Sequence, residues 1–384
     1  MTLPEQASHQ RTMIEFRGVT KTYDGGRPAV DDLSMEIARG EITVFVGPSG
    51  CGKTTSLRMI NRMVEPTSGQ ILLDGQDVAA QKAAELRRSM GYVMQSSGLM
   101  PHRTVLYNIA TVPRLNWVGR GDARQRATEL LDVVWLASEL GRRYPGQLSG
   151  GQQQRVGVAR ALAADPPVLL MDEPFSAVDP VVRAELQAEL LRLQRDLAKT
   201  IVFVTHDIDE ATILGDKVAV FAVGGRLAQF AAPEEILRAP VDDFVAGFVG
   251  RDRGFRHLSF QEGAHVQIHP IETIAASSLA DPTVSVRSPW TLLVDDDGRP
   301  HGWVPQAKRD RITRQADAVP GGSLYIRGDS LRRALDAALS SPSGLGVTVD
   351  DDGRAVGVVH AAEVFELIEA ARLDRGRAYH NTTV

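Results

Sequence analysis

Apolar positions in the first 250 residues form short unbroken runs, separated by stretches with helical spacing. Such runs predict strands that are buried on both faces, and three are clear: ITVFV at 42–46, PVLLMD at 167–172 and TIVFVTH at 200–206. Between the last two runs, the spacing at 182–199 predicts a helix that buries one face, formed by Leu186, Leu190, Leu193 and Leu197. Strands alternating with helices predict a parallel sheet with crossover helices.

After residue 260 the pattern changes and a repeat appears. VDDDGRPHGWV at 294–304 matches VDDDGRAVGVV at 349–359. Each copy predicts a hairpin in which an Asp-Gly turn joins two strands. Gene duplication is the simplest explanation of the match, and chance similarity of two short hairpins is the alternative.

Helical patterns flank the second hairpin. The helix before it has a cap at Asp329 or Ser330 and an apolar face formed by Leu331, Leu335 and Leu339. Another amphipathic helix is predicted at 361–373. The repeat is thus a small β-α-β-β-α unit with a reduced copy before it. We expect one domain over residues 13–250, the reduced unit over 260–315 and the complete unit over 322–374.

Composition narrows the class of protein. The chain has 384 residues, of which 43% are hydrophobic and 24% charged, as in ordinary soluble globular proteins. A net charge of −5 argues against a nucleic-acid-binding protein that acts through its overall charge. The single cysteine cannot form an intrachain disulfide, and neither a signal peptide nor an apolar run of membrane-spanning length is present. We therefore expect a cytosolic chain whose membrane role, if any, comes through a partner.

The segment GPSGCGKTT at 47–55 follows the strand predicted at 42–46 and fits the pattern G-x-x-x-x-G-K-[ST]. Glycines in such a loop let backbone N–H groups surround a phosphate, while the lysine reaches the β- and γ-phosphates and the threonine hydroxyl binds Mg²⁺. A turn without a ligand is disfavoured by the strand before it. The predicted phosphate-binding residues are Gly47, Pro48, Ser49, Gly50, Cys51, Gly52, Lys53, Thr54 and Thr55.

In VLLMDEPF at 168–175, Asp172 ends the predicted strand and Glu173 comes directly after it. Asp172 is positioned to hold Mg²⁺ through water, and Glu173 to orient and deprotonate an attacking water. Two solvated acids without a catalytic role are the alternative, which the phosphate-binding loop upstream disfavours.

LSGGQQQRV at 148–156 resembles the signature sequence of the ABC ATPases, a more specific match than the phosphate-binding loop alone. Four residues match other motifs of that family in the expected order: Tyr23 in TKTYDGG, Gln95 in GYVMQSS, Asp179 in SAVDP and His206 in VTHD. In the family, the residue at the position of Tyr23 stacks on adenine, and the residue at the position of Gln95 contacts Mg²⁺ and the attacking water. The residue at the position of Asp179 lies in the loop after the catalytic glutamate, and the residue at the position of His206 senses the γ-phosphate.

The resemblance implies an α/β fold, a P-loop NTPase domain of the ABC type with a helical signature subdomain. It implies a homodimer in which two copies pack head to tail around ATP. The residues that reach ATP across that interface would be Ser149, Gly150 and Gly151, and Gln152, Tyr23 and Asp179 join the nucleotide contacts. The implied catalytic residues are Glu173, His206 and Gln95, and the implied Mg²⁺ contacts are Thr54, Gln95 and Asp172.

Three segments further resemble the ATPase subunits of glycine betaine, proline and choline importers: 58–78, 95–117 and 242–258. This resemblance implies an integral membrane permease that docks near 95–117 and, indirectly, a substrate-binding protein. It places the chain at the cytoplasmic face of the membrane, with no nucleic-acid partner. An importer for another small solute remains an alternative. A soluble ABC ATPase of DNA repair or translation is disfavoured, because the chain has one motif set and no sustained heptads.

The repeated unit resembles a CBS domain, which implies a smaller α+β module after the ATPase domain. Where that family commonly has Thr and Asp, the second copy has His360 and Glu363, and the first has Pro305, Gln306, Ala307 and Lys308. These departures favour a regulatory or dimerising module, with a possible regulatory ligand, over a nucleotide sensor. KRDRITR at 308–314 is either a basic patch or a solvated linker helix.

Overall fold

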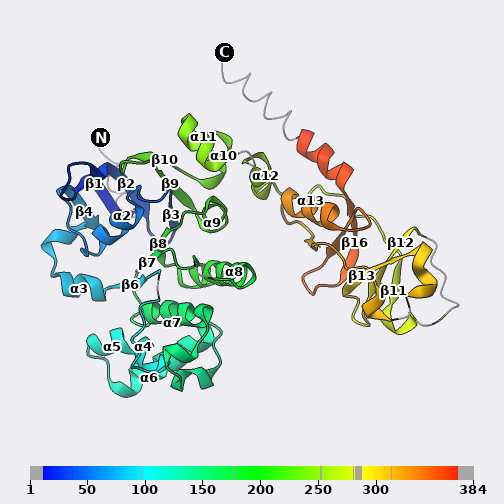
Figure 1. The fold of residues 1–384 in the computed structure, drawn as a ribbon, viewed down its shortest axis with the longest axis horizontal. Helices are drawn as coiled ribbons and strands as arrows, with labels where there is room; N and C mark the ends of the chain where they lie inside the picture. Colours follow the sequence, from blue (N-terminus) through cyan, green and yellow to red (C-terminus); the bar gives the residue numbers. More distant parts are fainter. Residues whose placement is uncertain are drawn as a thin grey trace, which may run out of the picture. The chain divides into compact units, whose positions relative to one another are not determined.

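A computed structural model describes residues 12–370, except 96, 177, 251–252, 280, 282–287 and 313. The chain divides into an N-terminal unit, Met1–Arg251, and a C-terminal unit, Asp252–Val384, whose elements are labelled in Figure 1. Helix residues 371–373 of the sequence prediction lie outside the described residues. No helix among the described residues is long and apolar enough to cross a membrane.

A six-stranded sheet forms the centre of the N-terminal unit, in the order β10-β9-β3-β8-β7-β6. Its strands are β3 (Ile42–Val46), β6 (Met90–Val93), β7 (Val168–Asp172), β8 (Thr200–Val204), β9 (Lys217–Phe221) and β10 (Leu227–Ala231). All pairs are parallel except β9 with β10. Every residue of β3, β7 and β8 is buried, which confirms the three strands predicted from apolar runs.

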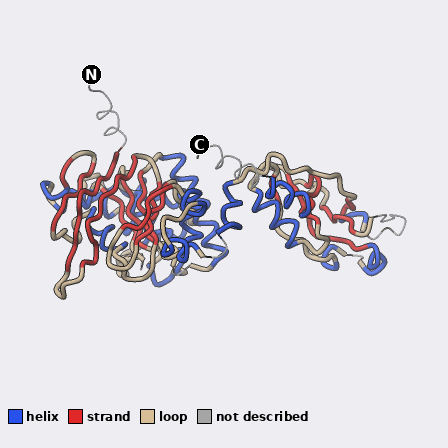
Figure 2. Tube along the Cα trace, turned by 90° about the horizontal axis from the view of Figure 1, so that it is seen from above, coloured by secondary structure: helices blue, strands red, loops and turns tan. Residues whose placement is uncertain are grey.

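A second, antiparallel sheet has the order β2-β1-β4-β5. It comprises β1 (Thr12–Thr22), β2 (Pro28–Ala38), β4 (Ser68–Leu73) and β5 (Gln76–Asp77). Helix α2 (Lys53–Ile60) shares one hydrophobic core with both sheets, to which Phe16, Phe45 and Leu57 contribute. Figure 2 draws the strands of this unit in red and its helices in blue.

Helices of the N-terminal unit fall into two groups. A helical region between β6 and β7 contains α4 (Val105–Ile109), α5 (Thr111–Leu115), α6 (Arg120–Val133) and α7 (Gly150–Leu162). The other helices are α2, α3 (Ala83–Arg88), α8 (Pro180–Leu197), α9 (Ile208–Leu214), α10 (Pro233–Arg238) and α11 (Asp243–Val249). The helix predicted at 182–199 is therefore α8. Leu190 and Leu193 are buried on it, but Leu197 is 41% exposed, because it is the last residue before the chain leaves the helix.

The C-terminal unit contains two three-stranded sheets, β11-β12-β13 and β14-β15-β16, each with one parallel pair and one hairpin. Their strands are β11 (Thr273–Ala275), β12 (Trp290–Val294), β13 (Pro300–Pro305), β14 (Tyr325–Ile326), β15 (Leu345–Val349) and β16 (Ala355–His360). The helices are α12 (Arg253–His257), α13 (Leu331–Ser340) and residues 361–370. Both predicted hairpins are confirmed, and Gly298 and Gly353 have matching φ values of 84° and 79° in their turns.

Ser330, not Asp329, caps α13, because its side chain accepts a hydrogen bond from Arg333 N. Leu331 and Leu335 are buried as predicted, whereas the prediction for Leu339 is wrong. Leu339 lies in the last turn of α13 and is 61% exposed. Helical spacing marks a face, but it does not say where the neighbouring element ends.

The two repeats pack on each other within one chain. Leu292 and Trp303 from the first repeat share a buried cluster with Val347 and Val358 from the second. Each repeat also pairs with the segment before the first strand of the other repeat, β14 or β11. Trp303 exchanges backbone hydrogen bonds with Val319, and Val358 exchanges them with His269. The C-terminal unit is therefore a pair of interlocked repeats.

Candidate active site

The loop at 47–52 connects β3 to α2 and contains three glycines with positive φ. A Cβ atom on Gly47, where φ is 148°, would lie 2.3 Å from the carbonyl oxygen of Phe221. A Cβ atom on Gly52, where φ is 94°, would lie 2.2 Å from the carbonyl oxygen of Ala29. Only glycine fits at both positions, so neighbouring strand ends hold the loop in its curled path.

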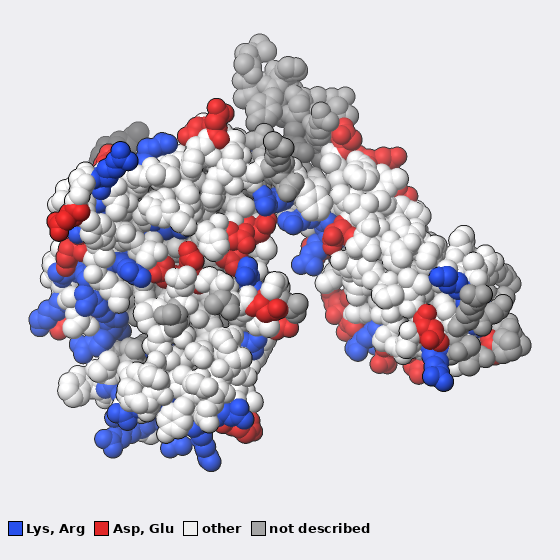
Figure 3. Space-filling view, viewed as in Figure 1, with Lys and Arg blue, Asp and Glu red and all other residues white. Residues whose placement is uncertain are grey.

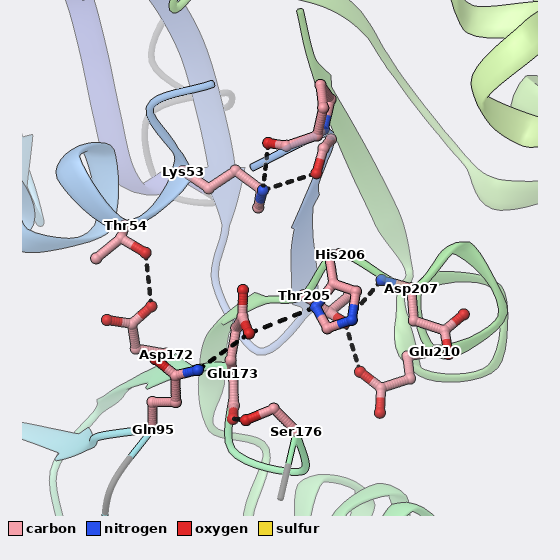
Figure 4. Close-up of polar contacts among 12 residues, drawn as sticks. Lys53, Thr54, Gln95, Asp172, Glu173, Ser176, Thr205, His206, Asp207 and Glu210 are labelled. Carbon is pink, nitrogen blue, oxygen red and sulfur yellow. Dashed lines mark hydrogen bonds and ion pairs between the residues drawn. The ribbon is translucent and has the colours of Figure 1, made fainter. Parts of the chain in front are cut away.

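Lys53 is the first residue of α2 and is 6% exposed. Its Nζ donates hydrogen bonds to the carbonyl oxygens of Gly47, at 2.7 Å, and Pro48, at 3.0 Å (Figure 4). These partners are neutral, so a buried positive charge faces the loop. Cys51 lies 3.7 Å from the same Nζ, and burial raises the pKa of its thiol, as expected for a small spacer residue.

Thr54 and Asp172 meet where α2 begins and β7 ends. The Thr54 hydroxyl donates a hydrogen bond to Asp172 Oδ1 at 2.8 Å (Figure 4). Arg58 and Tyr92 lie 3.3 and 3.4 Å from Asp172 Oδ2. A hydroxyl and a carboxylate oxygen this close are ligands of the kind that Mg²⁺ binds directly or through water.

Sequence reasoning missed Arg58 and Tyr92. Burial raises the pKa of the Tyr92 hydroxyl, so Tyr92 stays a neutral donor to Asp172. Arg58 stands four residues after Thr54 in α2, so helical spacing could have placed it on the same face.

Glu173 follows β7 with a φ of 46°, which is unusual for a residue other than glycine. Its backbone N–H donates a hydrogen bond to the carbonyl oxygen of Val204, at the end of β8. Its carboxylate Oε2 lies 3.4 Å from Gln95 Nε2 and 3.4 Å from His206 Nδ1 (Figure 4). Three residues predicted to be catalytic, from three different segments, are thus brought together.

The remaining predicted residues come from other segments of the chain. Tyr23 is half exposed, and Lys21 Nζ lies 5.1 Å from the centroid of its ring. Ser149 caps α7, because its Oγ accepts a hydrogen bond from Gln152 N while Gln152 Oε1 accepts one from Ser149 N. Ser149 and the adjacent Gly150 are exposed on the helical region. Asp179 is exposed just before α8.

One buried acidic residue of this region escaped sequence reasoning. Glu210 on α9 accepts a hydrogen bond from the Thr205 hydroxyl, next to His206 (Figure 4). Desolvation by burial raises the pKa of its carboxyl. Acidic residues are common in the first turn of a helix, so Glu210 gave no signal in the sequence.

Comparison with known proteins places this geometry in a family. Residues 30–176 match the family model described as ABC transporter. The carnitine transport ATP-binding protein OpuCA of Listeria monocytogenes is 42% identical, over 93% of this chain and 92% of its own length. The choline transport ATP-binding protein OpuBA of Bacillus subtilis is 40% identical, over 93% of this chain and 96% of its own length.

Solved structures agree with the fold. A dimeric ATP-binding cassette in a post-hydrolysis state, bound to ADP and phosphate, matches with a TM-score of 0.53 and 34% identity. The match covers 58% of this chain and 99% of that chain. The predicted ABC ATPase fold is thereby confirmed, and hydrolysis of ATP is the activity of the domain. The chain belongs to the ABC transporter family, as one of its ATP-hydrolysing subunits.

Proposed function

We propose that this chain is the ATPase subunit of an importer for glycine betaine, choline, carnitine or related osmoprotectants. The observation that carries the proposal is the extent of similarity to the carnitine and choline transport proteins. It spans more than nine-tenths of this chain and of each relative, and so includes the C-terminal unit. A likeness confined to the ATPase domain would not favour any solute.

ATP would be held by the loop at 47–55, where Lys53 is the buried cation that faces the phosphates. Thr54, Asp172 and Gln95 fit Mg²⁺, since they offer a hydroxyl, a carboxylate and an amide oxygen. When bound, Mg²⁺ supplies neutralisation of the phosphate charge. Glu173 accepts the proton of the attacking water, and His206 holds the Glu173 carboxylate in place.

A second copy of the chain is the partner that completes the site. Ser149 and Gly150 are exposed at the start of the thirteen-residue helix α7, and Ser149 Oγ already caps one backbone N–H. The other backbone N–H groups at the start of α7 are suited to donate hydrogen bonds to a phosphate of the ATP that the opposite copy holds. Gln152 supports the cap, and Asp179 lies on an exposed loop that a second copy can reach. The dimeric ADP-bound relative supports this arrangement.

An integral membrane permease would dock on the helical region. Trp117, in the loop after α5, is 92% exposed, and Leu115 beside it is half exposed. Large apolar side chains that are exposed next to each other are typical of interaction sites, whereas single ones are common on any surface. A nearby groove is lined by Tyr107, Arg114, Arg120 and Arg124, among others, and Figure 3 shows Lys and Arg side chains gathered over this part. The permease would hold the chain at the cytoplasmic face of the membrane, with a substrate-binding protein as indirect partner.

The C-terminal unit would act as a CBS-like regulatory module. Its repeats, which we place at 260–315 and 322–374, contact each other within one chain. Glu363 Oε2 lies 2.8 Å from His269 Nε2, so this acid is engaged inside the module instead of being open to a ribose. Arg309 donates to the carbonyl oxygens of Leu279 and Asp281, which leaves a smaller basic patch than KRDRITR suggests.

Uptake of labelled glycine betaine tests the proposal. Cells or vesicles that carry the chain with its genomic neighbours would be assayed at rising ionic strength, with Glu173→Gln as the inactive control. We expect uptake that needs Glu173 and rises with salt. Intact ATPase activity without betaine uptake at any salt would favour the second candidate, an importer for another small solute.

A further inference from the structure

Glu210 is a buried acidic residue to which the catalytic scheme above assigns no role. It is 6% exposed, and its two carboxylate oxygens have different partners. Oε2 accepts a hydrogen bond from the Thr205 hydroxyl at 2.5 Å, and Oε1 accepts one from Gln187 Nε2 on α8 at 3.3 Å. Burying a carboxylate costs free energy, so a buried carboxylate beside the catalytic residues calls for a function.

On one side, Glu210 fixes the backbone around His206. The Thr205 hydroxyl donates to Glu210 and accepts a hydrogen bond from the backbone N–H of Asp207 at 3.0 Å (Figure 4). The backbone N–H of Thr205 donates to the carbonyl oxygen of Phe45 in β3. The residues before and after His206 are therefore held by one hydroxyl whose direction Glu210 sets.

On the other side, Glu210 faces Arg183 in the first turn of α8. The Arg183 side chain donates from NH2 to the carbonyl oxygen of Val178 at 3.2 Å, and its backbone N–H donates to the carbonyl oxygen of Asp179 at 2.8 Å. Arg183 Nε lies 3.9 Å from Glu210 Oε1, and NH1 lies 4.0 Å from Asp207 Oδ2. Arg183 thus contacts Val178 and Asp179, just before α8, which we call the Asp179 loop. It also faces residues 205–207, between β8 and α9, which we call the His206 loop.

The Arg183–Glu210 contact is incomplete. Arg183 Nε is buried, and it has no hydrogen-bond partner among the described residues. A movement of about 1 Å would bring it within hydrogen-bond distance of Glu210 Oε1. A buried donor that lies just beyond hydrogen-bond distance of its acceptor is suited to a side chain that moves between two positions, one with the hydrogen bond and one without it.

We propose that Arg183 and Glu210 are positioning residues that couple the Asp179 loop to His206. The proposal rests on the roles given to these loops in the proposed function. When a second copy of the chain contacts the Asp179 loop, Val178 moves and shifts Arg183, which is hydrogen-bonded to its carbonyl oxygen, toward Glu210. Arg183 Nε then donates a hydrogen bond to Glu210 Oε1. Glu210 then holds Thr205 more firmly, and His206 is aligned with Glu173. Hydrolysis in each copy is thereby made dependent on contact with the other.

The test compares Arg183→Gln, Glu210→Gln and the double variant in the full chain. Glu210→Gln keeps an oxygen that can accept from Thr205 but removes the charge that faces Arg183. We expect kcat for ATP to fall roughly 10- to 100-fold in each single variant, with unchanged affinity for ATP, since the loop at 47–55 is untouched. The double variant would be no slower than the slower single variant, because both remove one interaction.

Arg192→Gln is the matched control, because Arg192 is an exposed arginine on the same helix that pairs with Glu189 instead of either loop. Wild-type kcat in folded Arg183→Gln would overturn the proposal, as would fully additive losses in the double variant. His206→Ala, assayed in parallel, separates two failures. If His206→Ala keeps its turnover, the catalytic assignment is wrong; if it is inactive while Arg183→Gln is normal, only the coupling is wrong.

Discussion

Glu173 joins the ends of two strands through its own backbone. It adopts a φ of 46° directly after β7 and donates its N–H to the carbonyl oxygen of Val204 at the end of β8. Residues held in rarely populated backbone conformations cluster at functional sites, where the surrounding structure maintains them. Here the conformation directs a carboxylate toward Gln95 and His206, each 3.4 Å away.

Glu173→Gln tests the role of this carboxylate. The amide has nearly the same shape but cannot accept the proton of water, so we expect hydrolysis to fall at least about 100-fold. Binding of ATP would persist and trap a closed dimer, which size-exclusion chromatography with ATP would detect. Glu185→Gln is a suitable control, since Glu185 is an exposed residue of α8 paired with Arg155. Near-normal turnover in Glu173→Gln would show that another group is the base.

Glu210 gives a prediction about pH. Burial raises the pKa of its carboxyl above the ordinary value of 4.5, so the folded chain keeps this proton at a pH where the unfolded chain has lost it. Its contribution to stability is therefore present below pH 4.5 and is lost as pH rises through the folded-state pKa. Glu210→Gln should thus gain thermal stability relative to wild type as pH increases, in melting curves between pH 4 and 8. A relative loss with rising pH would contradict this.

At the level of elements, continuous apolar runs were sufficient to predict β3, β7 and β8, because strands buried on both faces need apolar side chains throughout. The antiparallel sheet was not predicted. Its strand β1 pairs with β2 through several register shifts, which break the two-residue alternation that marks a half-buried strand. The hydrophobic pattern also did not predict where the buried face of each helix ends, since Leu197 and Leu339 fit the spacing but are exposed.

The same limit applies to the site. Lys53, Asp172 and Glu173 could be found because each lies at or just after the end of a strand within a recognisable spacing. Tyr92 and Glu210 could not, since Asp172, the partner of Tyr92, and Gln187, one partner of Glu210, are brought to them only by the packed fold. Their residue types also carry no local signal, as a tyrosine in a strand and an acid in a first helical turn are both common.

Gly357→Ala probes the interlocked repeats. Gly357 has a φ of 153°, and a Cβ atom there would lie 2.4 Å from the carbonyl oxygen of His269, the residue that pairs with Val358. We expect a loss of about 1–3 kcal/mol in the stability of the C-terminal unit, seen as a lower melting transition, with basal ATPase activity retained. Gly321→Ala is the control, because no atom lies within 4 Å of a Cβ atom there. Equal melting of both variants would argue against the close approach.

At the scale of the whole molecule, the two units have separate cores. Phe45 and Leu57 belong to a core of the N-terminal unit, whereas Leu258 packs with Tyr325 and Leu335 in the C-terminal unit. A boundary placed at residue 260 would therefore remove the neighbours of Leu258 and leave it exposed. The division after Arg251 keeps both cores complete.

A chain that ends at Gly250 should therefore fold and keep most of its basal ATPase activity, because the loop at 47–55, Glu173 and His206 all lie within the N-terminal unit. Its response to salt should change. Interactions between exposed charges weaken as the screening length shrinks, to about 8 Å at physiological ionic strength, so removal of a charged regulatory module alters how activity varies with salt. ATPase rates of the truncated and full chains across a salt series would measure this. An unchanged salt profile would deny the C-terminal unit a regulatory role, and an unfolded product would show that the two units depend on each other for stability.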